Sequence, residues 1–262
     1  MRKTNEDNLV RPFADRMLCL SLDVGEEMLK SGAEIHRVEE SIRMICKAYG
    51  AAHVEVFAIT SLIVASVRLV NGECSMQMRR VYTSSNHLLK IEAFNEISRK
   101  VCAEVPPLEK FEDMIREAKK ATVYSNLLHI FGGMLAASSF TIVFGGSLFD
   151  AAVATVMGLI VVLSGLLPIK NMNATTRCVL LSFLSGMFIC ALVRVGIGHD
   201  EHKIMIGTIM LLIPGLSFGN ALREMLDGDI ISGFFRLIQS CLTAVMIAVG
   251  FGLAIFLSEV VL

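Results

Sequence analysis

The stretch that decides the fold is Lys203–Asp229, KIMIGTIMLLIPGLSFGNALREMLDGD. It begins as an apolar membrane helix, meets Pro214-Gly215 partway through, and continues as a short helical pattern that ends in carboxylates. Because a proline removes a backbone hydrogen bond and clashes with the preceding turn, we expect the helix to kink or break there. Freed backbone groups are not tolerated against lipid and persist only inside protein or beside a watery cavity. Pro214 and Gly215 are therefore predicted to lie at the centre of a transport pathway.

Polar side chains gather around and beyond this break, at Ser217, Asn220, Arg223, Asp227 and Asp229, with Arg236 at the start of the next apolar segment. If a new helix begins after Gly215, its free N–H groups and the positive end of its dipole point at the break. Such a helix end suits a carboxylate or another anion, as in transporters built on discontinuous helices. Together with Pro214 and Gly215, these residues form the predicted substrate pathway. The simpler alternative is a proline-kinked helix with an ordinary cytoplasmic amphipathic extension.

The composition divides the chain into a water-facing front and a lipid-facing back. The 262 residues are 54% hydrophobic, with a mean hydropathy of +0.62 and a net charge of -1. Such an apolar chain is typical of membrane proteins, and its charge gives no indication of a nucleic-acid partner. There are 24 basic and 25 acidic residues, and 36 of these 49 precede Ala121. We therefore predict a cytoplasmic domain over residues 1–120 and a transmembrane domain over residues 121–262.

Hydrophobic periodicity predicts the elements of the front domain. Apolar residues recur every three or four positions over 11–30, 33–49, 85–104 and 108–120, which indicates amphipathic helices. Between the second and third helix the period changes to two or to β-branched runs over 53–59, 61–70 and 75–81, which indicates three strands. Asn71-Gly72 is typical of a hairpin turn between the last two strands. The front is therefore predicted to be a small α+β unit.

A charged cluster lies on the second predicted helix, at Glu34, Arg37, Glu39 and Glu40. Glu34 and Arg37 are three residues apart on one helix face, and paired carboxylates in a cleft can act as acid and base. A charged face of an amphipathic helix is, however, usually only solvated. The sequence contains no glycine-rich phosphate loop and no nucleophile elbow, and its cysteines and histidines lack metal-ligand spacing. We therefore predict neither an enzyme nor a bound cofactor or metal.

Five apolar segments are predicted to span the membrane, at about 124–144, 148–169, 178–197, 204–218 and 231–257. The fourth is short because Pro214-Gly215 interrupts it. Basic residues lie before the first segment, between the second and third, and between the fourth and fifth, at Lys119, Lys120, Lys170, Arg177, Arg223 and Arg236. Because basic residues are enriched in cytoplasmic loops, this distribution places the amino terminus inside and the carboxyl terminus outside the cell membrane.

Two motifs resemble those of the threonine/serine exporter family. The first is Gly32-Ala-Glu-Ile-His-Arg-Val-Glu-Glu40 followed by Tyr49-Gly50, and the second is Pro214-Gly215 with Asn220-Ala221, Asp227-Gly228-Asp229, Gly233 and Arg236-Leu237. The resemblance covers about residues 11–257. It implies a secondary exporter of small amino acids or dicarboxylates, with a cytoplasmic amino-terminal domain. It further implies structural or coupling roles for Arg37 and Glu39, and pathway or gating roles for Pro214, Gly215, Asn220, Asp227 and Asp229.

Long members of this family carry two sets of spans, and this chain resembles the version whose second set comes from a separate small polytopic membrane partner. In such pairs the implied substrate can be a dicarboxylate such as succinate rather than threonine or serine. The leading hypothesis is therefore a subunit of an ion-driven exporter of a small carboxylate, surrounded by membrane lipid and able to form homo-oligomers. No nucleotide-binding loop is present, which disfavours direct use of ATP. The alternative is a membrane-anchored enzyme or sensor whose cytoplasmic domain carries the activity.

Overall fold

The structure, a computed structural model, describes residues 12–82, 85–120, 125–166 and 174–261. Backbone contacts divide the chain into two compact units. The first comprises Met1–Val123 and Leu216–Leu237, and the second comprises Tyr124–Gly215 and Ile238–Leu262. The predicted domain boundary at Ala121 lies outside the described residues and stays a prediction. The segment after residue 215 is nevertheless notable, because it returns to the first unit after four helices of the second.

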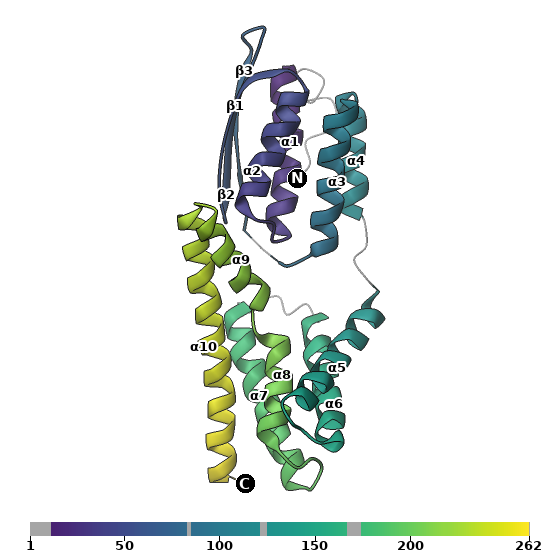
Figure 1. Cartoon of the computed structure of the whole chain (residues 1–262), viewed down its shortest axis with the longest axis vertical. Helices are drawn as coiled ribbons and strands as arrows, with labels where there is room; N and C mark the ends of the chain where they lie inside the picture. The colour runs from purple at the N-terminus through teal and green to yellow at the C-terminus, as the bar shows by residue number, and fades with distance from the viewer. Residues whose placement is uncertain (1–11, 83–84, 121–124, 167–173, 262) are drawn as a thin grey trace. The chain divides into compact units, whose positions relative to one another are not determined.

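The first unit contains three layers before residue 121, with two helices between a sheet and a second pair of helices (Figure 1). The middle layer is α1 (Phe13–Lys30) and α2 (Ile35–Ala48). The outer layers are the strands β1 (Ala51–Ile59), β2 (Leu62–Leu69) and β3 (Cys74–Arg80), and the helices α3 (Leu88–Glu104) and α4 (Leu108–Lys120). These elements confirm the predicted order of two helices, three strands and two helices. The core lies between the layers, because the apolar stripes of the middle helices are buried on both sides.

The sheet is antiparallel, in the order β1-β2-β3. Its register pairs Val56 with Ala65 and Ser66 with Met76. Side chains of a strand alternate between the two faces, so Val56 is buried against the helices while Phe57 is exposed on the other face. The predicted hairpin turn at Asn71-Gly72 is confirmed, with the Leu69 N–H donating to the Glu73 carbonyl across it.

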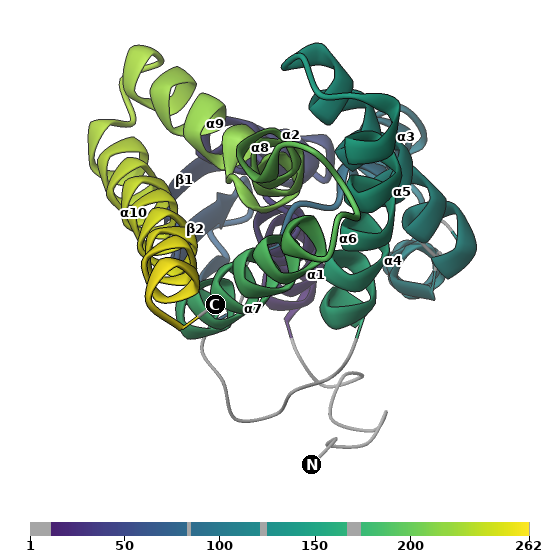
Figure 2. The same ribbon diagram turned by 90° about the horizontal axis from the view of Figure 1, so that it is seen from below.

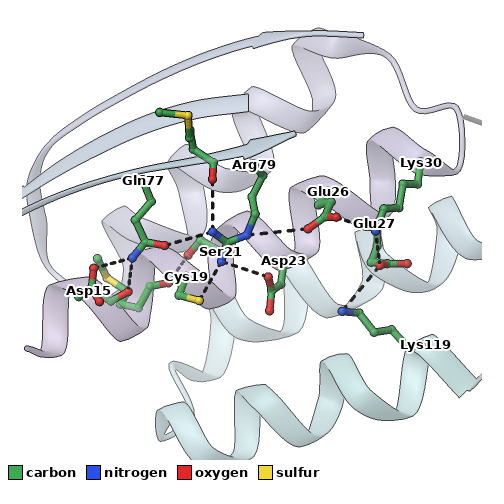
Figure 3. A network of polar contacts seen from close by, with 12 residues as sticks. Asp15, Cys19, Ser21, Asp23, Glu26, Glu27, Lys30, Gln77, Arg79 and Lys119 are labelled. Atoms are coloured by element: carbon green, nitrogen blue, oxygen red, sulfur yellow. Dashed lines mark hydrogen bonds and ion pairs between the residues drawn. The ribbon is translucent and has the colours of Figure 1, made fainter. Parts of the chain in front are cut away.

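A polar network fastens the edge strand β3 and the helix α4 to α1 (Figure 3). Arg79 of β3 reaches Asp23 of α1, with 3.5 Å between Nη2 and Oδ1. Lys119 of α4 lies 3.7 Å from Glu27 of α1, measured from Nζ to Oε1. Burial raises the pKa of Asp23, and the charges of Lys119 and Arg79 oppose this rise. The charged groups of this network pair with one another across the layers. The network therefore has a structural role, which is to join β3 and α4 to α1.

The second unit is a bundle of apolar helices, made of α5 (Asn126–Val143), α6 (Leu148–Leu166), α7 (Ala174–Arg194), α8 (Glu201–Leu212) and the part of α10 (Ile230–Val261) that follows residue 237. Figure 2 shows α8 beside α6 and α7, and the contacts agree. In the described part of the chain, four helices are long and apolar enough to cross a membrane. A fifth span results if α8 and the following helix α9 (Gly215–Leu226) count as one broken span.

Small residues bring these helices close together. A Cβ atom at Gly158 of α6 would lie 2.8 Å from the Gly133 carbonyl of α5, and one at Gly207 of α8 would lie 2.6 Å from the Ala137 carbonyl. Such separations leave no room for a side chain, as expected where membrane helices associate through small residues.

Two of the predicted spans have ends that differ from the observed helix or lie outside the described residues. The third predicted segment reaches residue 197, but α7 ends at Arg194 because Gly196, with φ 88°, adopts a left-handed conformation that ends the helix. The last residues of the second segment, and with them Lys170, lie outside the described residues.

Candidate functional site

The chain breaks at Pro214-Gly215 as the sequence predicts. Helix α8 ends at Leu212, Ile213 is extended with φ −63° and ψ 129°, and α9 begins at Gly215. A proline disfavours helical backbone at the residue before it, which explains the extended Ile213. The two helices are bent by 53° at this break. The break in the helix is confirmed, and its role in a pathway stays a prediction.

Helix α9 ends in a left-handed glycine that turns the chain back into α10. Gly228 has φ 100°, the Asp229 N–H donates to the Glu224 carbonyl at 2.9 Å, and the Gly228 N–H donates to the Met225 carbonyl at 3.4 Å. This pair of bonds is a Schellman motif, which ends a helix and satisfies its last carbonyls. Asp227 is exposed at this end of α9, and half-buried Asp229 immediately precedes α10. The Asp-Gly-Asp sequence therefore forms the corner between two helices of the first unit.

The corner is tightly packed at Gly233 of α10. A Cβ atom there would lie 2.7 Å from the Ala221 carbonyl and 2.9 Å from the Met225 nitrogen. We expect Gly233→Ala to lower the free energy of unfolding by roughly 1–3 kcal/mol through overpacking. Gly252→Ala on the same helix is the matched control, because a Cβ atom there meets nothing within 4 Å. Thermal unfolding of the purified full-length variants in detergent measures both, and equal midpoints would contradict the packing described for the corner.

One face of α9 lies against the helical layers of the first unit. Ser217, Ala221 and Glu224 follow one another at helical spacing, so they share a face. Ser217 Oγ accepts a hydrogen bond from Asn86 Nδ2 at 3.2 Å. Ala221 and Glu224 are the fully buried residues of this helix. Ser217 is thus placed against the loop before α3, while Asn220 is half-buried on the neighbouring surface.

Glu224 is the most deeply buried charged side chain of this contact. It is 1% exposed, and its Oε1 lies 3.2 Å from Nη2 of Arg236, a side chain that is 11% exposed. The same Oε1 accepts a hydrogen bond from the Ile35 N–H at 3.3 Å. Ile35 is the first residue of α2, where N–H groups lack partners within the helix and the helix dipole favours an anion. The carboxylate of α9 therefore caps a helix that begins 189 residues earlier in the chain.

The second oxygen of this carboxylate is an exception to the usual satisfaction of buried polar atoms. Glu224 Oε2 is buried and has no hydrogen-bond partner among the described residues. The sequence reasoning selected Arg223, Asp227 and Asp229 and missed Glu224 between them. The helical spacing of Ser217, Ala221 and Glu224 could have predicted it, because this spacing places Glu224 on the same face as the other two residues.

The charged cluster of the front domain contacts α9 through Glu34. Arg223 Nη1 lies 2.6 Å from Glu34 Oε1, and Arg37 Nε lies 3.2 Å from Glu34 Oε2. Glu34 thus connects one arginine from each of the two motifs found in the sequence. Because Arg223 and Arg37 are 63% and 56% exposed, solvent screens these pairs and each contributes little to stability.

Glu39 bonds to the sheet, whereas Glu40 on the same helix is exposed. Glu39 Oε1 accepts a hydrogen bond from the Ala58 N–H of β1 at 2.7 Å, which ties α2 to the sheet. Burial raises the pKa of Glu39, the Ala58 hydrogen bond lowers it, and the nearby negative charge of Asp229 raises it again. Glu40 is exposed on the solvent side. The structure therefore brings together Glu34, Glu39, Arg223, Asp229 and Arg236, and leaves Glu40 outside the cluster.

The other side of this helical corner is apolar and exposed. Its side chains are Leu216, Phe218, Leu222 and Leu226 of α9, and Ile230, Ile231, Phe234 and Phe235 of α10. A helix with a buried polar face and an exposed apolar face is the reverse of a helix on a soluble protein. An exposed apolar face of this kind is typical of helices in contact with lipid.

The comparison with protein families decides the class of the protein. The ThrE family model, which describes a threonine/serine exporter, matches residues 20–258. The chain belongs to the threonine/serine exporter family. The match spans both units, so the membrane helices and the front domain are parts of one exporter-family architecture. Membership makes the chain a multi-pass membrane protein of a transporter family. No curated protein and no solved structure matches the chain.

Proposed function

We propose that this chain is one subunit of a secondary transporter that exports a small carboxylate across the cell membrane. The substrate is threonine, serine or a dicarboxylate such as succinate, and an ion gradient drives its export. The description of the family supports threonine and serine. The dicarboxylate follows from the resemblance to members whose second set of spans is a separate protein. That partner is a small polytopic membrane protein, and the chain itself forms homo-oligomers within the assembly.

The observation that carries this proposal is the broken span. A span whose helix stops at Leu212 and restarts at Gly215 exposes backbone groups that lipid cannot satisfy. Broken helices at membrane depth are typical of transporter binding sites. In this proposal α8 and α9 count as one span, which gives five spans with the amino terminus in the cytoplasm and the carboxyl terminus outside.

The contacts of α9 supply a way for the cytoplasmic domain to act on the break. Buried Glu224 holds α9 to the start of α2, and Arg223 and Ser217 add exposed contacts to Glu34 and to the loop before α3. A movement of the front domain therefore displaces α9, the helix that follows Pro214-Gly215. Gating by the cytoplasmic domain is the role that this connection supports.

Reconstitution into vesicles tests the proposal. The full-length chain is purified with the membrane protein that co-purifies with it, and vesicles are loaded with labelled threonine, serine or succinate. We expect efflux of one of these carboxylates from vesicles that contain both proteins, and loss of that efflux when an ionophore removes the ion gradient. Absence of efflux for all three substrates, with both proteins correctly inserted, would contradict the proposal.

A further inference from the structure

A cavity of about 1000 Å³ lies within the second unit, between the ends of four helices. Its walls come from the start of α5, the end of α6, the start of α7 and the last two residues of α8. These four helix ends belong to one side of the bundle, because α5 and α7 begin where α6 and α8 end. Its volume is at the upper end of the range for small-molecule sites. The wall at Leu212 is two residues from Pro214 along the chain.

The wall is mostly apolar and contains a few polar groups. The polar side chains are His129 of α5, Ser164 of α6 and Arg177 of α7, and Cys178 follows Arg177 on the wall. None of the described lining residues is acidic. An apolar hollow with a small number of polar groups is the usual form of a ligand site.

Arg177 is held in this wall by the end of a neighbouring helix. Its Nη2 donates to the Ser164 carbonyl in the last turn of α6, where carbonyls lack partners within the helix. A guanidinium carries five N–H donors in a planar fork, so this contact leaves others directed elsewhere. The surroundings of the guanidinium are open on this side, since even a Cβ atom at Gly165 would lie at an ordinary contact distance of 3.9 Å from Nη2. The side chain is only half-buried, so an incoming anion can reach it.

We propose that this cavity is the binding site for the carboxylate group of the exported molecule, with Arg177 as its ligand. A planar guanidinium binds a carboxylate through two parallel hydrogen bonds. With no acidic side chain in the described lining, the charge of Arg177 is available to an anion. His129 also lines the cavity and can bind a second polar group of the same molecule. This inference rests on the proposed export function, and with the proposed orientation the cavity is the entrance from the cytoplasm.

The native Cys178 provides the test. In membranes that contain the full-length chain, a small maleimide modifies the cysteines, and mass spectrometry of the peptides measures the rate at each one. Succinate, L-threonine and L-serine are added separately. We expect at least one of them to slow modification of Cys178 severalfold, while exposed Cys74 of the front domain reacts at an unchanged rate. Comparison of succinate with the amino acids identifies the class of carboxylate.

Variants of Arg177 assign the effect to its guanidinium. Because a hydrogen bond to a charged group is strong, Arg177→Gln is expected to raise the half-protecting concentration about ten- to hundredfold. The matched control is Arg194→Gln, which removes the same charge at the other end of α7 and is expected to leave protection unchanged. Failure of all three carboxylates to protect Cys178, equal protection by chloride, or full protection in Arg177→Gln would each overturn the proposal.

The same variants separate this inference from the proposed function. If vesicles with the unaltered chain show no export but a carboxylate still protects Cys178 through Arg177, the site stands and the export function fails. If export continues at the normal rate in Arg177→Gln, the export function stands and the site is wrong.

Discussion

Replacing Pro214-Gly215 with Ala-Ala is expected to reduce export to background while the protein stays in the membrane. Alanine is the best helix former, whereas proline in a helix interior costs about 3 kcal/mol, so the variant favours one continuous helix. A continuous helix removes the 53° bend between α8 and α9. It also rotates and displaces the face of α9 that contacts Ile35 and Glu34. The variant therefore removes both the opened backbone and its connection to the front domain.

Efflux from vesicles, normalised to the amount of protein inserted, measures this effect. Gly219→Ala is the matched control, since it adds a Cβ atom to the same short helix at a position where nothing lies within 4 Å. We expect the control to export normally. Undiminished efflux from the Ala-Ala variant would show that the break is not part of the pathway.

Arg236→Met is expected to give a large loss of stability in the first unit. It leaves the buried Glu224 carboxylate without its cation, and breaking one side of a buried ion pair typically costs about 3–5 kcal/mol. The double variant Glu224→Leu/Arg236→Met is expected to recover most of this loss, because a pair of apolar residues of similar volume leaves no buried charge. The double variant still lacks the acceptor for the Ile35 N–H, so its recovery is incomplete.

Thermal unfolding in detergent, completed as a double-mutant cycle, measures the coupling between the two side chains. Arg37→Met is the matched control, since Arg37 is also 3.2 Å from a glutamate but is 56% exposed. A surface pair of this kind contributes about 0–1 kcal/mol. If Arg236→Met were no more destabilising than Arg37→Met, the buried pair would not hold the corner together.

Local sequence patterns were sufficient for most of the elements. The apolar period of 3.6 or 2 predicted α1 to α4 and the three strands, and Asn71-Gly72 predicted the hairpin, because these features depend on residues close in sequence. Pro214 predicted the break for the same reason. The end of α7 was predicted too late because its apolar run continues past Gly196, and hydropathy does not register a left-handed glycine.

The site depended on contacts that no local pattern contains. Arg223 and Ser217 were assigned to a pathway, and the structure places both against the front domain, although neither contact tests a role in transport. Glu224 was missed because its partners, Ile35 and Arg236, lie on other helices and only the fold brings them within reach. From the sequence, Arg177 was predicted only to mark the inner side of the membrane, since its place in a cavity depends on the packing of four helices.

The capping of α2 by Glu224 also determines the order in which parts of the chain can complete their folding. The ribosome completes the front-domain layers long before residue 224 exists, so the Ile35 N–H remains without this acceptor until α5 to α8 have been synthesised. Contacts of such high sequence separation form late in folding. The front domain is therefore completed only after most of the membrane helices have been made. A fragment that ends at residue 120 would correspond to a nascent intermediate and not to the mature domain.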